Sequence, residues 1–211
     1  MALRAPGDKK TGMPDPVPSP DPASPLASAL SLSARQLYAS RTVLIFGEVT
    51  TALAESVSTQ LLALAAAGPE PIRVLVHSPG GHVEAGDTIH DVIRFIGPTV
   101  RMLASGWVAS AGALIFAAAP HPHRLALPNT RFLLHQPLGG MGGPATDVEI
   151  EARQILLMRE RLNRIFAEAT GQPYEKLLRD TDRNHWLSAR DALEYGLVSR
   201  IVAHHSEVDA A

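Results

Sequence analysis

Two hydrophobic patterns, one typical of strands and one typical of helices, alternate along the chain from Thr42 onwards. Short apolar runs predict buried strands at Thr42–Phe46, Ile72–His77, Val100–Leu103, Phe132–His135 and Leu197–Ile201. Apolar residues at helical spacing predict helices over Thr50–Ala66, Ala85–Ile96, Ser110–Ala118, Thr146–Thr170, Pro173–Asp182 and Ser188–Tyr195. Repeated strand–helix units predict an α/β fold in which a mainly parallel sheet lies between helices.

Two local signals mark helix ends. Thr146-Asp147-Val148-Glu149 has the form of a capping box, in which the first and fourth side chains each bond a backbone N–H of the other residue. We therefore expect the long helix to open at this box. Gly196 follows Tyr195 where a helix commonly ends in a left-handed glycine.

Composition narrows the possible functions. At 211 residues and 45% hydrophobic, the chain can bury one substantial core. The formal net charge of −2 gives no indication of a nucleic-acid or anionic-membrane surface. The sequence has no cysteine, which excludes disulfides, thiolate catalysis and cysteine-ligated zinc.

The ends of the chain differ from its middle. Seven of the 17 prolines lie within residues 1–25, interleaved with Ser, Ala and Asp, a composition that cannot bury enough apolar surface to order itself. We expect a disordered tail over residues 1–25, a single domain over residues 26–203 and a C-terminal tail over residues 204–211. No apolar run approaches the ~18 residues of a membrane-spanning helix. No signal-peptide core is present either, so a soluble cytoplasmic protein is expected.

Three segments carry residues suited to acyl transfer. Ser110 lies in the small-residue stretch Ala109–Ala113 at the start of a predicted helix, and His135 ends a predicted strand 25 residues later. Gly80-Gly81 follows a predicted strand and can form a tight turn that presents a backbone N–H. A serine nucleophile needs a base and N–H donors for the oxyanion that it generates, so these segments together form a candidate catalytic site.

Each segment also has a plain structural interpretation. Ala109–Ala113 can be a close helix-packing segment, His135 a hydrogen-bonded half-buried side chain, and Gly80-Gly81 a bare turn. A dinucleotide-binding loop is disfavoured, because the G-x-G-x-x-G spacing and a suitably placed acidic residue are both absent.

Two further polar groupings are expected to be structural. His121 and His123 have no third ligand, so we expect a surface turn there and no metal site. Asp180 and Asp182 are expected to form a solvated turn paired with the arginines next to them in sequence.

In their order along the chain, these motifs resemble the ClpP family, the proteolytic subunit of the Clp protease. The resemblance runs from about Arg41 to Ile201, roughly three-quarters of the chain. The matching segments are Ser78-Pro79-Gly80-Gly81, Ala85-Gly86, Ala109–Ala113, Leu127-Pro128-Asn129, His135–Gly140, Ala145–Ile150, Arg159–Asn163, Thr170–Pro173, Arg179–Arg183 and Glu194–Leu197.

The resemblance implies a crotonase-like ClpP fold with a protruding handle helix that begins near Thr146. It implies a serine endopeptidase with Ser110 as nucleophile, His135 as general base and the backbone N–H groups of Gly81 and Ala111 as oxyanion hole. Neither a metal nor a cofactor is implied. The implied assembly is a tetradecamer of two stacked heptameric rings, homomeric or heteromeric, that receives unfolded polypeptides from an AAA+ unfoldase.

The chain departs from the family pattern at three positions. The third triad residue, usually Asp, falls on Asn184, which can accept a hydrogen bond from the histidine ring but contributes no charge. Asp182 lies ~6–7 Å from it along an extended chain, too far to replace it. Ala111 replaces a larger apolar residue, and Pro144 removes a backbone N–H from the handle region.

Two main hypotheses follow. In the first, the chain is an active ClpP-type endopeptidase subunit that uses Ser110, His135 and Asn184. In the second, it is a weakly active or regulatory ring subunit that requires an active paralogue, an idea motivated by Asn184 and Pro144. An acyl-CoA-processing crotonase is disfavoured, because the sequence pairs a serine with a histidine and has no extra segment for an adenine pocket.

Overall fold

The computed structural model describes residues 25–140 and 142–208, and the chain divides into two units between Gln36 and Leu37. Helix α1, Pro25–Ala39, spans this boundary. The unit that begins at Leu37 carries the sheet and all the candidate site residues. Residues 1–24 of the expected N-terminal tail lie outside the described residues.

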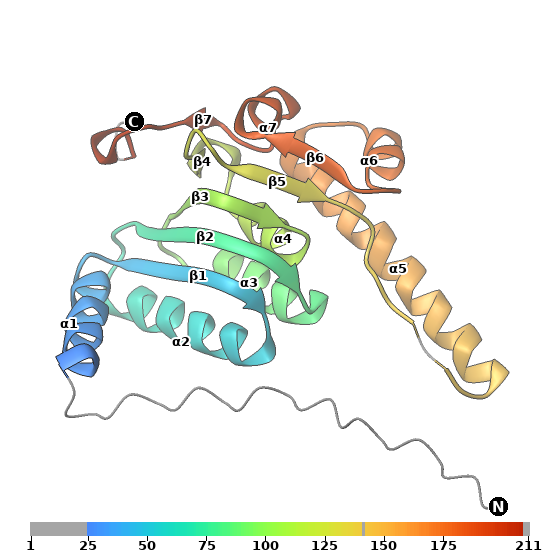
Figure 1. Cartoon of the computed structure of the whole chain (residues 1–211), viewed down its shortest axis with the longest axis horizontal. Coiled ribbons are helices and arrows are strands. Elements are labelled where there is room, and N and C mark those ends of the chain that lie inside the picture. The colour runs from blue at the N-terminus through green and yellow to red at the C-terminus, as the bar shows by residue number, and fades with distance from the viewer. Residues whose placement is uncertain (1–24, 141, 209–211) are drawn as a thin grey trace, which may run out of the picture. The chain divides into compact units, whose positions relative to one another are not determined.

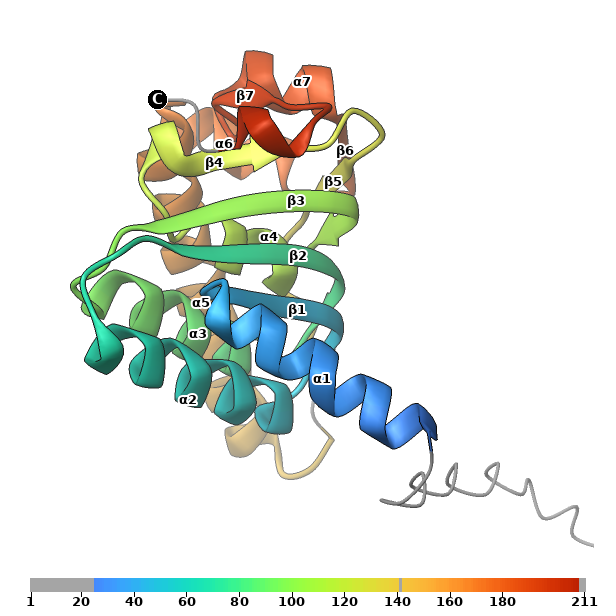
Figure 2. The same ribbon diagram turned by 90° about the vertical axis from the view of Figure 1, so that its left-hand side faces the viewer.

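The sheet of this unit contains seven strands within the described residues. They are β1 Thr42–Val49, β2 Ile72–Gly81, β3 Val100–Ala109, β4 Arg124–Ala126, β5 Arg131–Leu134, β6 His185–Ser188 and β7 Arg200–Ile201. The main order is β1-β2-β3-β4-β7, with β5 pairing both β3 and β6. Figure 2 shows the first four strands of this order from bottom to top. Every pair is parallel except β5–β6, so the mainly parallel sheet is confirmed.

The helices of the unit follow the strands in the expected alternation (Figure 1). They are α2 Thr51–Ala67, α3 Val83–Phe95, α4 Ala111–Phe116, α5 Ala145–Thr170, α6 Tyr174–Asp180 and α7 Ala189–Tyr195, with 3-10 turns at His121–His123 and His205–Glu207. Among the described residues, no helix is both long and apolar enough to span a membrane.

The burial pattern of β1 shows which face of the sheet is covered. Val43 and Ile45 are fully buried, whereas Leu44 and Phe46 on the opposite face are 38% and 48% exposed. Successive strand residues point to opposite faces. Within the described part of this unit, helices therefore cover one face of β1 and leave the other open. The expectation of a sheet between helices is wrong here, because the outward residues of β1 have no helical layer to bury them.

Strand β3 forks. Its first part, Met102–Ala104, pairs with β4, and its last part, Trp107–Ala109, pairs with β5. Gly106 lies between the two parts with φ +59, a left-handed conformation that glycine adopts without steric cost. The fork directs β5 and β6 away from the main sheet and toward α5 (Figure 1).

Helix α5 is the expected protruding handle (Figure 1). Only Leu162, Asn163 and Phe166, in its second half, are buried. The expected capping box at Thr146 is wrong. The helix begins at Ala145 with Pro144 as N-cap, because Pro144 takes φ −53 and ψ 143 and no side chain caps this end. The helix ends at Gly171, which is left-handed with φ +71.

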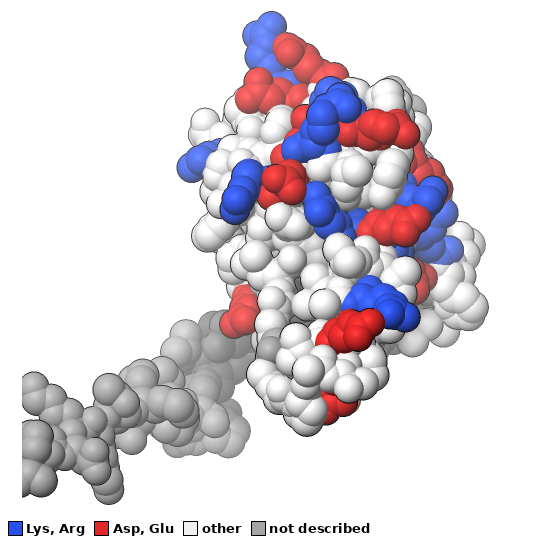
Figure 3. Space-filling model, turned by 90° about the vertical axis from the view of Figure 1, so that its right-hand side faces the viewer, with Lys and Arg blue, Asp and Glu red and all other residues white. Residues whose placement is uncertain are grey.

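Both signs of charge occur on the face that carries α5 and α6. Figure 3 shows blue and red side chains interspersed across it rather than gathered into one patch of either sign. Several of them pair along α5 at helical spacing, as Arg153 does with Glu149 and Arg164 with Glu160. Such pairs make a solvated helix surface, in keeping with the small net charge of −2.

Candidate functional site

Ser110 lies at the sharp turn between β3 and α4. Its backbone has φ 54 and ψ −122, an uncommon conformation for a residue with a side chain. Two hydrogen bonds hold it there: its N–H donates to the carbonyl of Leu133 at 2.9 Å, and its carbonyl accepts from the N–H of Leu114 at 3.0 Å. A strained backbone conformation that is held in place by surrounding contacts is often found at a functional site.

The segment Ser78–Gly81 packs directly on this position. It is the end of strand β2, so the expected tight turn at Gly80-Gly81 is wrong. Gly80 has φ +95, and a Cβ added there would lie 2.6 Å from the Cβ of Ser110. Gly112 is also close to this segment, because its Cβ would lie 3.0 Å from the Cβ of Ser78. The Ser78 hydroxyl is itself fixed, since it donates to the carbonyl of Gly47 at 2.6 Å and accepts from the N–H of Gly80 at 3.1 Å. The structure therefore brings together the two small-residue segments that the sequence singles out.

The two expected oxyanion donors belong to these same segments. Ala111 opens α4, and the first N–H groups of a helix have no acceptor within it. A Cβ on Gly80 would lie 3.2 Å from the nitrogen of Ala111. Gly81 has φ +151 and packs against the backbone of Val49 so closely that a side chain would overlap the Val49 carbonyl. Ala111 is thus adjacent to Ser110, whereas Gly81 lies against Val49 of β1, where only glycine fits.

His135 follows the last residue of β5 and shares a small pocket with Ser110. The pocket is mostly apolar and is lined by Val83, Ser110, Ala111, Leu114, Leu134, His135, Pro137, Leu162 and Phe166. Burial lowers the pKa of His135 below its ordinary value, because an apolar surrounding disfavours the charged ring. Near neutral pH the imidazole is therefore held in the neutral form that can accept a proton.

Asn184 lies in the loop just before β6, and His135 lies just after β5. Leu134 and His185 are the last pair of the antiparallel register, so His135 and Asn184 are each adjacent in sequence to one member of that pair. The chain beyond β5 stays attached to this loop through Gln136. The Gln136 N–H donates to the carbonyl of Thr181 at 2.7 Å, and its side-chain amide donates to the carbonyl of Asp182 at 2.7 Å.

Ser110 and His135 line the same pocket, whereas Asn184 is exposed and does not line it. Within residues 25–140 and 142–208, no hydrogen bond joins Ser110 to His135 or His135 to Asn184. Catalytic hydrogen bonds are often long without substrate and tighten when it binds. Burial is also the only cause of the shifted pKa of His135, which has no charged partner.

The acidic residues before Asn184 have different partners from those expected. Asp180 accepts from Lys176 and from the Tyr195 hydroxyl, both at 2.7 Å, and Asp182 pairs with Arg159 of α5 at 2.9 Å. The expected pairing with the adjacent arginines is wrong, since the fold brings cations from α5 and α6 closer. Asp182 is occupied by Arg159, in keeping with a structural role.

The remaining histidines form no candidate site. His121 and His123 make a 3-10 turn, with His121 exposed. Within the described residues no cluster of His, Cys, Asp and Glu side chains could hold a metal ion.

Comparison with known proteins agrees with this fold. The model of the Clp protease family matches residues 27–205. The ATP-dependent Clp protease proteolytic subunit 3 of Rhizobium etli is 60% identical over 172 residues, covering 82% of this chain and 89% of that protein. The proteolytic subunit 2 of Gluconobacter oxydans is 54% identical over 203 residues, covering 95% of this chain and 91% of that protein.

Solved structures show the same relationship. ClpP1 from Listeria monocytogenes has a TM-score of 0.77 and 50% identity, covering 84% of this chain and 99% of that one. An asparagine-to-aspartate variant of the same protein has a TM-score of 0.79 with the same identity and coverage. The α/β fold with its protruding handle is thus the ClpP fold. The chain belongs to the Clp protease family.

Proposed function

We propose that this chain is a serine endopeptidase subunit in which Ser110 is the nucleophile, His135 the general base and Asn184 the residue that orients the histidine. The observation that supports this most directly is the shared pocket of Ser110 and His135, with Asn184 adjacent in sequence to His185, the register partner of Leu134. Membership of a family of proteolytic subunits supports peptide-bond hydrolysis as the reaction.

The reaction follows the acyl-enzyme route. The Ser110 hydroxyl attacks the scissile carbonyl while His135 takes its proton, and the N–H groups of Gly81 and Ala111 donate to the resulting oxyanion. The histidine then gives the proton to the departing amine, and the acyl group stays on the serine. Water, deprotonated by the same histidine, releases the acyl group as a free carboxyl and restores the hydroxyl.

Asn184 makes this site weaker than one with Asp. Its side-chain carbonyl can accept the ring N–H of His135 and hold one orientation, but it cannot stabilise the imidazolium by charge. In the serine-protease template, replacing the aspartate by asparagine lowers kcat about 10⁴-fold, largely through a wrong tautomer. That value is an upper limit if Asn184 presents its oxygen to the ring. We expect measurable but low activity.

The assembly is part of the proposal. Apolar side chains on the handle lie in solvent in the single chain: Ile150, Leu156 and Leu157 are 56%, 62% and 53% exposed. Such residues on a projecting helix are suited to contact with another subunit. With the relatives named ATP-dependent proteolytic subunits, this supports stacked heptameric rings in the cytoplasm that receive unfolded polypeptides from a Clp-type ATPase.

A serine-reactive phosphonate tests the proposal. Incubated with the full chain, the probe should label wild type, should not label Ser110→Ala, and should label His135→Ala far more slowly. The mass of the particle, measured by size-exclusion chromatography with light scattering, shows whether rings have formed. Absence of labelling in fully assembled wild type would contradict a catalytic role.

A second candidate is a ring subunit that is weakly active alone and works beside an active paralogue. Asn184 favours it because the triad lacks its charge, and Pro144 favours it because the handle begins without a backbone N–H donor at that position. Co-purification with a second ClpP-like chain, and much higher activity of the mixed rings, would support it. Equal activity of the homomeric particle would remove it.

A further inference from the structure

The loop that presents Asn184 is held from two sides. On the side of the β5 strand, Gln136 donates two hydrogen bonds, both at 2.7 Å, to the carbonyls of Thr181 and Asp182. On the side of the handle, Arg159 donates to the Asp182 carboxylate at 2.9 Å. The backbone carbonyl of Asp182 therefore bonds to the segment that follows β5, whereas its carboxylate bonds to helix α5.

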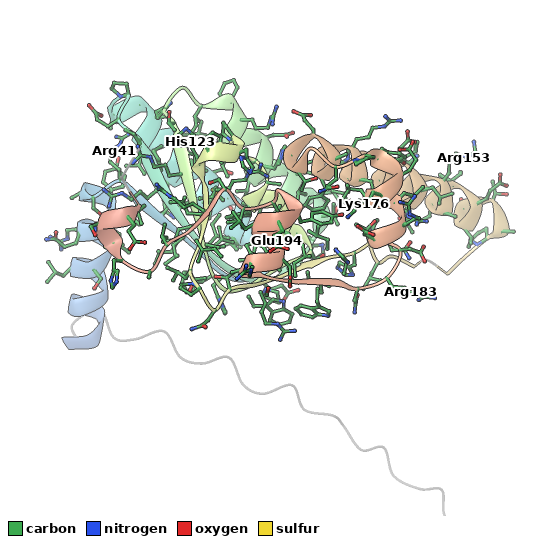
Figure 4. All side chains as sticks on the ribbon, turned by 90° about the horizontal axis from the view of Figure 1, so that it is seen from above. Arg41, His123, Arg153, Lys176, Arg183 and Glu194 are labelled. Atoms are coloured by element: carbon green, nitrogen blue, oxygen red, sulfur yellow. The ribbon has the colours of Figure 1, made fainter. Side chains whose placement is uncertain are left out.

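The second attachment is reinforced one turn further along α5. The buried Thr181 hydroxyl donates to the side-chain oxygen of Asn163 at 2.8 Å. Arg159 and Asn163, four residues apart on one side of the helix, thus bond to consecutive residues of the loop. Arg183 takes no part, since it is exposed at the outer side of the loop (Figure 4).

The Arg159–Asp182 pair is better suited to fixing a position than to stabilising the fold. The Asp182 side chain is 56% exposed and that of Arg159 is 24% exposed. An ion pair this exposed adds little to the free energy of folding. Its effect is local, because it limits where the loop can lie relative to α5.

The position of the loop is important because residue 184 is an asparagine. The attraction between a carboxylate and an imidazolium falls off gradually with distance. A neutral amide–imidazole hydrogen bond is lost once the atoms separate beyond about 3.5 Å or lose alignment. The loop must therefore be placed more tightly for an asparagine than for an aspartate.

We propose that Arg159 is a positioning residue, whose ion pair with Asp182 keeps Asn184 within reach of His135. This inference rests on the proposed function, because it assigns Arg159 a role through the triad. It makes the handle helix α5 part of the active-site framework, since the guanidinium that holds the loop projects from it.

Kinetics with a fluorogenic peptide test the inference. Arg159→Gln should lower kcat between about 10-fold and about 100-fold and leave KM within about twofold, since a misplaced catalytic group affects the chemical step rather than binding. Arg159→Lys keeps the charge and should recover most of kcat. Arg164→Gln is the matched control: it removes a cation and an exposed ion pair from the same helix without touching the loop, and should leave kcat unchanged.

A double-mutant cycle separates positioning from general damage. Arg159→Gln should have little further effect on kcat in Asn184→Ala, where no side chain remains to be placed, and a reduced effect in Asn184→Asp. An equal loss of kcat in all three backgrounds would overturn the proposal.

Hydrogen exchange provides a readout that does not require activity. Arg159→Gln should speed amide exchange at Gln136 and across residues 181–185, whereas Arg164→Gln should not. Unchanged exchange in Arg159→Gln would overturn the positioning role even if the enzyme is active. If wild type is not labelled at Ser110, the proposed function fails, and the exchange result still decides whether Arg159 holds the loop.

Discussion

A methyl group added at Gly80 tests the contact between Ser110 and the segment Ser78–Gly81 at the end of β2. In Gly80→Ala the new Cβ would lie 2.6 Å from the Cβ of Ser110 and 2.9 Å from the carbonyl oxygen of Ala109. Neither neighbour is a flexible side-chain end, so the backbone of one segment has to move. The backbone at Gly80, with φ +95, also disfavours alanine.

The size of the effect follows from these distances. Ordinary van der Waals contact begins at 3.4 Å, so Ser110 and the end of β2 must separate by about 0.8 Å. A displacement of about 1 Å in a catalytic group can lower the rate about 100-fold, which corresponds to about 2.7 kcal/mol in the activation free energy. Strain at the left-handed backbone should destabilise the fold by about 1–3 kcal/mol.

The assay combines phosphonate labelling of Ser110, peptide hydrolysis and thermal unfolding. Gly80→Ala should label about 100-fold more slowly than wild type. Its Tm should fall by about 2–4 °C for each kcal/mol lost, as expected for a chain of this size. Gly97→Ala is the matched control, because a Cβ there meets nothing within 4 Å, and it should behave as wild type. A folded Gly80→Ala protein with wild-type labelling would refute the reasoning, since the end of β2 and the nucleophile could not then be in contact.

The other predictions concern the histidine, its orienter and one helix cap. Because burial lowers the pKa of His135 and the base must be neutral, the acidic limb of the pH–rate profile should lie below the ordinary histidine range; a limb above that range would contradict this. Asn184→Asp should raise kcat, toward an upper limit of about 10⁴-fold. It should also move the acidic limb to higher pH, because a carboxylate favours the imidazolium; an unchanged profile would mean that residue 184 does not face the ring. Ser188→Ala removes the capping box that Ser188 forms with Asp191 and should destabilise the fold by about 1 kcal/mol in thermal unfolding without changing kcat; a loss of activity would contradict a purely structural role.

Hydrophobic periodicity predicted the helices and the long strands well, because their apolar faces are buried in one core. It ended β1, β2 and β3 too early and β5 one residue too late. Strand β1 continues to Val49 and β3 to Ala109, although Gly47 and Gly106 interrupt the apolar runs. The sheet tolerates these glycines through irregularities, as the register shift between Phe46 and Glu48 shows.

The hydrophobic pattern of the sequence did not predict two of the strands, β4 and β6. Strand β4, Arg124–Ala126, has only three residues, and β6, His185–Ser188, depends on antiparallel pairing with β5. Such short segments become strands because an edge is available to them, and the edge exists only once the rest of the sheet has formed.

The candidate site was predictable to different degrees. Ser110 and Gly81 stand in small-residue segments whose composition already indicates close approach. The contact between Arg159 and Asp182 spans 23 residues and joins a helix to a loop, so no spacing rule indicates it. The capping motif at Thr146 was a false signal, because Pro144 fixes a helix-opening conformation before it.

On one edge, β3 pairs with two strands in succession, β4 and then β5, so the number of residues between the two pairings matters. One added residue at Ser105 or Gly106 would leave the alignment with β4 untouched, yet advance the rest of the strand by about 3.3 Å along β5. Since successive side chains face opposite ways, the hydroxyl of Ser110 would also turn from one side of the sheet toward the other. The number of residues between Ala104 and Trp107 thus determines where Ser110 lies relative to β5. Insertions or deletions in this stretch should be tolerated far less well than substitutions.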